Sequence, residues 1–301
     1  MILNKKYNCL IAIGCSHMFG SEHKSTNNNK QPSTETWANH LGNYLNLPVY
    51  NFSIPGASNQ TILRRLYISL DFVASHKLNP LFVLQWATTD RFELFSQSAY
   101  NVCQDWPWLS TLGEVLKKSG NQTLQEIAKH FYKAFDSLSC FYETLKSVEH
   151  ANLILSNKNF LAINCLGSGW PTETLKHPMT EFVRHFDTPS GIYERTLESI
   201  LKNLGANKDI DMEKYNVVGY KSHEINPLYS NAVFSLLWKN ILKYPWWLYH
   251  DDTFQTGLRK FVIDNNWPLG PDNHPLEHAN KMAFEYMISQ TAFLDLLERK
   301  N

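Results

Sequence analysis

The sequence predicts an α/β domain built on a doubly wound parallel sheet, and two patterns in its first ninety residues carry this prediction. Residues 7–13, 48–53 and 80–86 form short, nearly continuous apolar runs, which are typical of strands buried on both faces. Between them, residues 36–46 and 59–75 place apolar side chains at helical spacing. Strands that alternate with helices form parallel sheets, because each helix crosses back over the sheet between two strands.

The pattern continues less regularly through the rest of the chain. A long helix is expected over 123–147, where apolar residues recur at three- and four-residue steps, and a fourth strand is expected at 160–166, FLAINCL. A final helix is expected over 276–298. No segment stands out as a fifth strand, and the aromatic stretch DWPWLS has no assignment.

Residues 167–245 interrupt the alternation of strands and helices. A segment punctuated by Gly, Pro and Ser leads into expected helices near 193–204 and 231–244. Because an ordinary crossover needs only about a dozen residues, we interpret this stretch as a helical insertion, either a lid or a partner surface. The insertion belongs to a single domain that spans residues 1–301.

Composition and charge exclude several classes of protein. The chain has 301 residues, 43% of them hydrophobic, which is enough to bury a sizeable core. Lys+Arg and Asp+Glu number 28 each, so there is no net positive charge to hold nucleic acid. No apolar stretch approaches the ~20 residues of a membrane span, and the first apolar run is too short for a signal peptide. An odd number of cysteines without metal-type spacing indicates a reduced, cytoplasmic protein: Cys9, Cys15, Cys103, Cys140 and Cys165.

The loops after the first three strands hold the residues best suited to chemistry. In a parallel sheet the carboxyl ends of the strands share one edge, so GCSHMFGSEHK, PGASN and TTDRFE are expected to converge there. Ser16 follows the first strand by two residues, just past Gly14. It is either a nucleophile or a serine that forms the turn and caps the next helix.

A serine nucleophile requires a general base and a group that orients the base. His274 lies in the turn-rich stretch GPDNHP, where rigid backbone holds a side chain outside the core, and Asp272 stands two residues before it. Gly56, Asn59 and Thr89, in the loops after the second and third strands, offer hydrogen-bond donors for an oxyanion. Purely structural roles stay open: His274 begins a helix, Gly56 serves a turn and Asn59 caps a helix.

These ordered blocks resemble the SGNH (GDSL-type) hydrolases. The turn GCSHMFG is similar to the family's first block, G-D-S-x-x-x-G, with Cys15 in place of the aspartate, and NFSIPGASN resembles the second block, which carries a glycine. His274 followed by Pro275 resembles the fifth block, D-x-x-H. The resemblance covers the chain outside 167–245 and implies a three-layer α/β/α flavodoxin-like fold. It also implies a catalytic serine, histidine and aspartate at Ser16, His274 and Asp272, with Gly56 as an oxyanion donor.

Two departures from the family pattern affect the expected site. The third block is usually G-x-N-D, whose asparagine donates to the oxyanion, whereas this chain has ATTD and would need Thr89 or Asn59 as a substitute. Loss of one such donor typically lowers the rate by about 100- to 1000-fold. The acid also stands two places before His274 instead of three. Either a Ser-His dyad acts alone, or the orienting acid is one of Asp272, Asp251, Asp252 and Asp264.

Two other arrangements compete with this one. Cys15 is intrinsically a better nucleophile than serine, but its side chain is expected to point away from that of Ser16. Several His and Asp residues offer metal ligands, but Pro275 separates two of the histidines at an expected helix start, and no carboxylate or Cys completes a known ligand pattern. We therefore expect no metal among His17, His250, His274, His278, Asp251, Asp252 and Asp272.

Together these features predict a serine esterase or acyl hydrolase that uses no cofactor. The expected substrate is a small-molecule or glycan ester, with an acetyl group on a carbohydrate or other small metabolite as the leading case. One alternative is an O-acyltransferase that uses the same residues. Another is a non-catalytic SGNH-like binding module, which the missing asparagine at Thr89 motivates. No nucleic-acid or membrane partner is expected.

Overall fold

The structure is a computed structural model of the 301-residue chain. It describes residues 7–26, 31–89, 91–95, 108–111, 122–134, 137–168, 170, 237, 240–241, 243–247, 257–290, 293–294 and 297. Two compact units divide the chain: Met1–Trp170 with Ile241–Asn301, and Pro171–Asn240. Nearly all of the second unit lies outside the described residues, as do most of the expected insertion and its two expected helices.

A parallel sheet of five strands forms the centre of the first unit. Its strand order is β2-β1-β3-β6-β7, and every neighbouring pair is parallel. The predicted α/β class is thus confirmed, and the fifth strand is the two-residue β7, which is too short to leave a pattern in the sequence. The strands are β1 (Cys9–Gly14), β2 (Val49–Asn51), β3 (Pro80–Trp86), β6 (Ala162–Leu166) and β7 (Trp246–Trp247).

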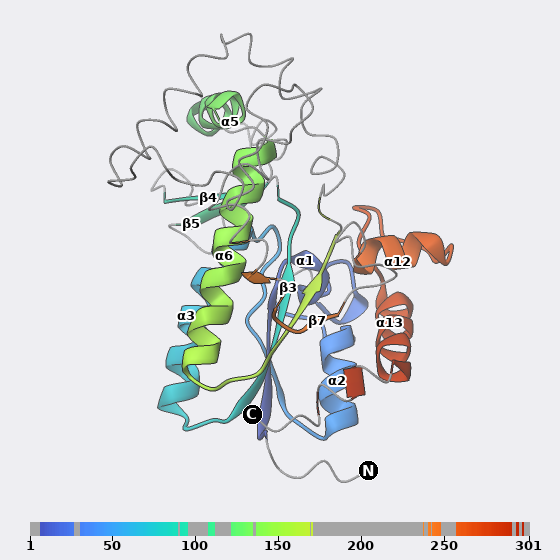
Figure 1. The fold of residues 1–301 in the computed structure, drawn as a ribbon. Helices are drawn as coiled ribbons and strands as arrows, with labels where there is room; N and C mark the ends of the chain where they lie inside the picture. The colour runs from blue at the N-terminus through green and yellow to red at the C-terminus, as the bar shows by residue number, and fades with distance from the viewer. Residues whose placement is uncertain are drawn as a thin grey trace, which may run out of the picture. The chain divides into compact units, whose positions relative to one another are not determined.

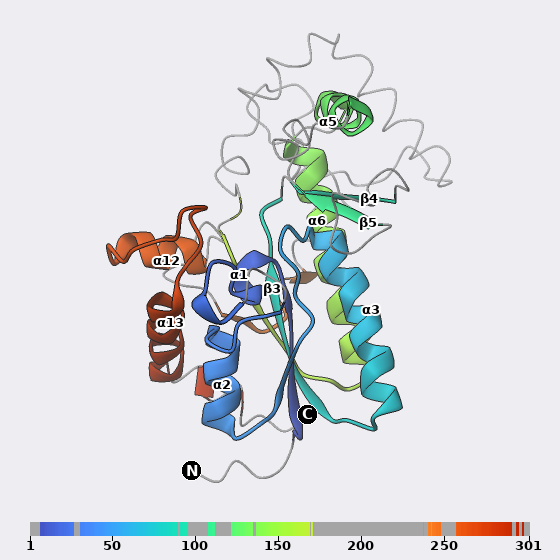
Figure 2. The same ribbon diagram turned by 180° about the vertical axis from the view of Figure 1, so that it is seen from behind.

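Helices cover both sides of this sheet, as Figures 1 and 2 show from opposite directions. On one side lie α3 (Asn59–Ser75) and α6 (Ser137–Asn157). On the other lie α2 (Trp37–Leu45), α12 (Leu258–Asp264) and α13 (Glu277–Ser289). Two short elements, α1 (Ser16–Phe19) and η1 (Lys24–Thr26), follow β1 directly.

Local signals explain where the first two long helices begin. The Thr36 side chain accepts a hydrogen bond from the backbone N–H of Asn39, which caps α2. The Ser58 side chain accepts one from the N–H of Thr61 in the same way, which caps α3. Ser58 is therefore the cap of α3, and the alternative that Asn59 fills this role is wrong.

Two expectations for the middle of the chain need correction or completion. The single helix expected over 123–147 is instead two helices, α5 (Gln122–Ala134) and α6. Their apolar residues keep a common helical spacing across the junction, so periodicity alone does not reveal the break. The unassigned aromatic stretch contributes β5 (Trp108–Thr111), which pairs antiparallel with β4 (Phe92–Phe95).

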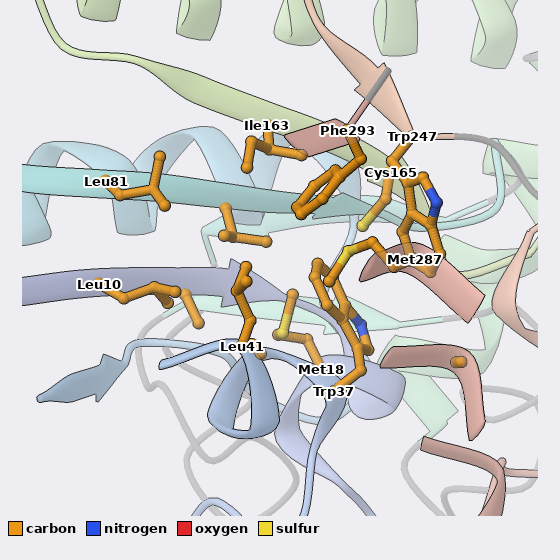
Figure 3. Close-up of a cluster of buried hydrophobic side chains, with 14 of the residues drawn as sticks. Leu10, Met18, Trp37, Leu41, Leu81, Ile163, Cys165, Trp247, Met287 and Phe293 are labelled. Carbon is orange, nitrogen blue, oxygen red and sulfur yellow. The ribbon is translucent and has the colours of Figure 1, made fainter. Parts of the chain in front are cut away.

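A buried apolar cluster fills the space between the sheet and helices α2, α12 and α13 (Figure 3). Leu10, Leu81 and Ile163 enter it from three adjacent strands. The Trp37 and Trp247 rings meet there with their centroids 5.4 Å apart. Side chains alternate along a strand. The strand residues next to Leu10, Leu81 and Ile163 are therefore buried on the other face of the sheet, toward α3 and α6. Burial on both faces is the reason that the strands read as continuous apolar runs.

Two further findings bear on the expected class of protein. In the described part of the chain, no helix is long and apolar enough to cross a membrane. The described cysteines, Cys9, Cys15, Cys140 and Cys165, are all buried and free.

Candidate active site

The turn between β1 and α1 places Ser16 at the carboxyl end of β1, which lies between β2 and β3 in the sheet. A Cβ atom on Gly14 would lie 2.7 Å from Met18 Cβ and 3.0 Å from Gln85 Cβ, so only glycine lets α1 pack this closely on β1 and β3. The helix then ends after one turn at Gly20, which has a left-handed φ of 77° and donates its N–H to Ser16 O. Ser16 is thereby held on a short, rigid turn.

The Ser16 side chain has the environment of a reactive group more than that of a cap. Cys15 is the residue before α1, and no side chain caps the helix. Ser16 is 3% exposed, and its Oγ has no hydrogen-bond partner among the described residues. A buried hydroxyl without a partner is costly. Ser21 and Ser53 share this state, so it is the position of Ser16 at the strand end that distinguishes it. Cys15 is equally buried, and its thiol is free.

His274 is oriented by a carboxylate that sequence reasoning missed. Its Nδ1 lies 2.7 Å from Glu22 Oε2, and both side chains are largely buried. With Nδ1–H donating to Glu22, the free lone pair of the ring is on Nε2, which is the protonation state that a general base requires. Within the described part of the chain, Nε2 makes no hydrogen bond.

Backbone groups fix the Glu22 carboxylate in place. Its Oε1 accepts the N–H of Asp272 at 2.9 Å, and its Oε2 accepts the N–H of His274 at 3.3 Å. Gly270 allows this close approach, since a Cβ there would lie 2.5 Å from Glu22 Oε2. Although burial alone would raise the pKa of Glu22, the hydrogen bonds from Asp272 and His274 lower it below the ordinary value of 4.5. The carboxylate is therefore ionised at neutral pH.

The expected orienting acid, Asp272, does not occupy this position. Its backbone N–H binds Glu22, its side chain is exposed, and the partner of the His274 ring is Glu22. An oxygen of the Asp272 carboxylate lies within 4.8 Å of donor atoms of Glu22 and His274, but the hydrogen bond of the His274 ring is to Glu22. Asp264 pairs instead with Lys260 on α12, at 2.7 Å. Asp251 and Asp252 lie outside the described residues.

His17, the residue after Ser16, is a second imidazole at the site. Its ring meets that of His274 edge to face, with centroids 5.5 Å apart, and its Nδ1–H donates to Gly167 O at 2.9 Å. Burial, followed by the nearby His274 and Arg91, lowers the pKa of His17 to about 3. His17 is therefore neutral and adds no charge that would oppose protonation of His274.

His17 connects the expected nucleophile with the expected base, because it follows Ser16 in the chain and its ring contacts that of His274. The base stands beside the neighbour of the nucleophile, and yet Ser16 Oγ has no hydrogen bond to His274 in this structure. Catalytic hydrogen bonds are often loose before substrate binds. The fold thus brings the His274 ring against the residue that follows Ser16.

Asn59 is committed to structure and does not serve as an oxyanion donor here. Its Oδ1 accepts the N–H of Ala87 at 2.8 Å. Its Nδ2 donates to Ala87 O at 3.3 Å, to Thr88 O at 3.5 Å and to Thr144 Oγ1 at 2.9 Å. These bonds use both amide hydrogens, so the side chain clamps α3 to the loop after β3 and to α6.

Gly56 and Thr89 lie in the loops after β2 and β3. Gly56 has a φ of 77° in the turn after β2, a conformation that glycine adopts without strain. The loop is tied to the turn after β1, because Asn51 Nδ2 donates to Met18 O at 2.9 Å. Thr89 is 5% exposed just after β3. Asp90, the last residue of the ATTD stretch, lies outside the described residues.

One group of side chains has donor atoms close enough to consider a metal ion. Among the described residues, donor atoms of Glu22, Asp272 and His274 lie within 4.8 Å of one another. Glu22 already accepts two backbone N–H groups and the His274 ring N–H. A cation at this point would face those N–H groups, which repel it. The environment of Glu22 therefore suits a carboxylate that accepts hydrogen bonds better than one that binds a metal ion.

Comparison with known proteins assigns no family. No protein-family model matches the chain, and no curated protein matches it. The chemistry of the site therefore rests on the geometry of its own residues. The sequence did contain a signal for Glu22, the residue that sequence reasoning missed. Glu22 is a carboxylate within the loop after the first strand, GCSHMFGSEHK, which was expected to hold site residues.

Proposed function

We propose that this protein is a serine esterase or acyl hydrolase of SGNH type, with Ser16 as the nucleophile and His274 as the general base. The Glu22–His274 pair carries the proposal, because an anchored carboxylate leaves the lone pair of the imidazole on Nε2 next to the Ser16–His17 turn. The strand order β2-β1-β3-β6-β7 supports a flavodoxin-like three-layer arrangement, since it equals the order 2-1-3-4-5 of that fold.

In the proposed reaction, Ser16 Oγ attacks the ester carbonyl while His274 Nε2 takes its proton. Glu22 stabilises the imidazolium that forms, and neutral His17 adds no opposing charge. The backbone N–H groups of Ser16 and Gly56, with the Thr89 hydroxyl, are assigned to the oxyanion. His274 then returns its proton to the leaving alcohol, and water, activated by the same ring, releases the acyl group. No step uses a cofactor.

Fluorophosphonate labelling of the purified protein tests this proposal. We expect one adduct on Ser16, located by peptide mapping, that is lost in Ser16→Ala and slowed in His274→Ala. Ser53→Ala is the matched control, because Ser53 is also 3% exposed and its Oγ also lacks a partner among the described residues. It should label like the wild type. A folded wild-type protein that forms no adduct would overturn the proposal and favour a binding module.

The same preparation separates hydrolysis from acyl transfer. A sugar or polyol acceptor is added to a reaction with an activated acetyl ester, and free acetate is compared with acetylated acceptor. Hydrolysis predicts that acetate remains the main product at all acceptor concentrations. Transfer predicts that acetylated acceptor replaces acetate as the acceptor concentration rises.

A further inference from the structure

We propose that Arg91 supplies a second side-chain donor to the oxyanion, beside the Thr89 hydroxyl and in place of an asparagine in the loop after β3. This inference rests on the proposed function, in which an oxyanion forms at Ser16. It assigns a role to a residue that the expected site did not include. It also names a side chain that can replace the missing asparagine, a role that Asn59 does not fill because its amide hydrogens already make other hydrogen bonds.

The Arg91 side chain joins the loops that follow the two neighbours of β1 in the sheet. Strand β1 lies between β2 and β3. Arg91 follows β3, and its Nη1 donates to Ala57 O in the loop after β2, at 3.2 Å. Ser16 follows β1, the strand that lies between these two. Ala57 is also the residue next to Gly56, so the guanidinium borders the backbone assigned to the oxyanion.

Hydrogen bonds from α3 hold one residue before Arg91 and one residue after it. Before it, Ala87 is bound by the Asn59 clamp. After it, Glu93 accepts hydrogen bonds from Arg64 Nη2 at 2.8 Å and Thr61 Oγ1 at 2.6 Å, both on α3. Arg91 thus lies between two anchored residues, Ala87 and Glu93, as suits a preorganised donor.

The guanidinium of Arg91 has donors to spare. Of its five N–H groups, Nη1 supplies the bond to Ala57, while the buried Nε has no partner among the described residues. In the same part of the chain no carboxylate pairs with it. Arg64 provides the contrast, because Glu93 binds both its Nε and its Nη2. A buried cationic donor without an acceptor fits a group that meets its acceptor only during the reaction.

The charge of Arg91 also reaches the nucleophile turn. The pKa of His17 is lowered first by burial, then by His274 and then by Arg91. A cation that disfavours a positive charge at His17 favours a negative charge in the same place. An oxyanion beside Ser16 is such a charge.

The step balances with Arg91 protonated throughout. The bond from Ser16 Oγ to the carbonyl carbon forms, the carbonyl π pair moves to oxygen, and the Ser16 proton moves to His274 Nε2. Arg91 donates an N–H to the resulting O⁻. When the carbonyl re-forms, the bond to the leaving alcohol breaks, and His274 returns its proton to that oxygen.

Steady-state hydrolysis of p-nitrophenyl acetate by variants of the full chain tests this role. Arg91→Met should lower kcat by about 100- to 1000-fold with a small change in KM. Arg91→Lys keeps the charge without the planar fork, and its kcat should fall between those of the wild type and Arg91→Met. Arg259→Met is the matched control, since it removes another charge felt by His17 from a side chain on α12. Its kcat should stay within a few-fold of the wild type.

Guanidinium rescue separates this role from a structural one. Millimolar guanidinium ion should restore part of the kcat of Arg91→Met, which a loop that has merely lost its anchor would not show. Wild-type protein that labels on Ser16, together with an Arg91→Met variant that keeps its kcat, would overturn the inference and leave the proposed function intact. Wild-type protein that does not label would overturn both. If Arg91→Met does not fold, a wild-type kcat in Arg91→Lys would also overturn the inference.

Discussion

Glu22 and His274 are 252 positions apart in the chain, and their side chains meet at 2.7 Å between Oε2 and Nδ1. This contact joins the loop after the first strand to the loop before the last long helix. The imidazole is therefore oriented by a residue of the loop after β1, whereas Asp272, on the same turn as His274, contributes a backbone N–H to Glu22. The acid and the base of the proposed site therefore come from opposite ends of the sequence.

Replacing Glu22 by Gln tests the orienting role. The amide retains the size of the side chain, but its NH₂ must face a backbone N–H of Asp272 or His274. We expect kcat/KM for ester hydrolysis to fall by about 100- to 10 000-fold, because the ring loses its preferred tautomer. Asp272→Asn is the control and should change kcat/KM by less than about tenfold. The reverse order of these two effects would make Asp272 the orienting acid.

Gly270→Ala tests the space that the carboxylate needs. The added methyl would lie 2.5 Å from Glu22 Oε2, so the carboxylate must shift away from His274. We expect a loss of kcat in the direction of Glu22→Gln, and a free energy of unfolding lowered by about 1–3 kcal/mol. Chemical denaturation and steady-state kinetics measure the two effects. Unchanged kcat in a folded variant would show that the carboxylate has room to move without consequence.

Asn59→Ala tests the structural clamp. The change removes the partner of the Ala87 N–H and the donor to the Thr144 hydroxyl, while the Ala87 carbonyl keeps the hydrogen bond from Trp170 Nε1. The free energy of unfolding should fall by about 1–3 kcal/mol, because these groups are buried. Thr144→Val removes only one of the bonds and should cost less. If Asn59→Ala instead keeps its stability and loses kcat, the side chain is an oxyanion donor after all.

The depressed pKa of His17 predicts a specific dependence of stability on pH. Between its ordinary pKa of 6.5 and its folded pKa of about 3, the unfolded chain binds a proton at His17 that the folded chain does not. The stability linked to His17 is therefore complete above pH 6.5 and is lost as pH falls toward 3. From pH 7 to pH 5 this term amounts to about 2 kcal/mol.

Denaturant unfolding of His17→Gln at pH 7 and pH 5 checks this prediction. The amide keeps a donor for Gly167 O but does not titrate. The variant should therefore lose about 2 kcal/mol less than the wild type over this interval. Equal losses in the two proteins would mean that His17 accepts a proton in the folded state.

The local pattern of the sequence was sufficient for much of the sheet and its helices. Apolar runs bounded by Gly and Pro marked β1, β3 and β6, and helical spacing located α2 and α3. These elements bury one or both faces, and a buried face requires apolar residues at the regular spacing of a helix or a strand. The two-residue β7 has too few side chains to show such a spacing. The apolar residues of α5 and α6 share one helical spacing, so the spacing does not show that they are two helices.

The site divides in the same way. The sequence by itself determined that Ser16 stands at a strand end and that His274 lies on a turn before a helix, because glycine and proline fix such turns locally. Only the tertiary structure decided which carboxylate contacts the His274 ring, which side-chain amide joins α3 to the loop after β3 and to α6, and which guanidinium joins the loops after β2 and β3. Contacts between loops far apart in the chain depend on strand order and side-chain direction, and no local pattern of residues encodes either of these.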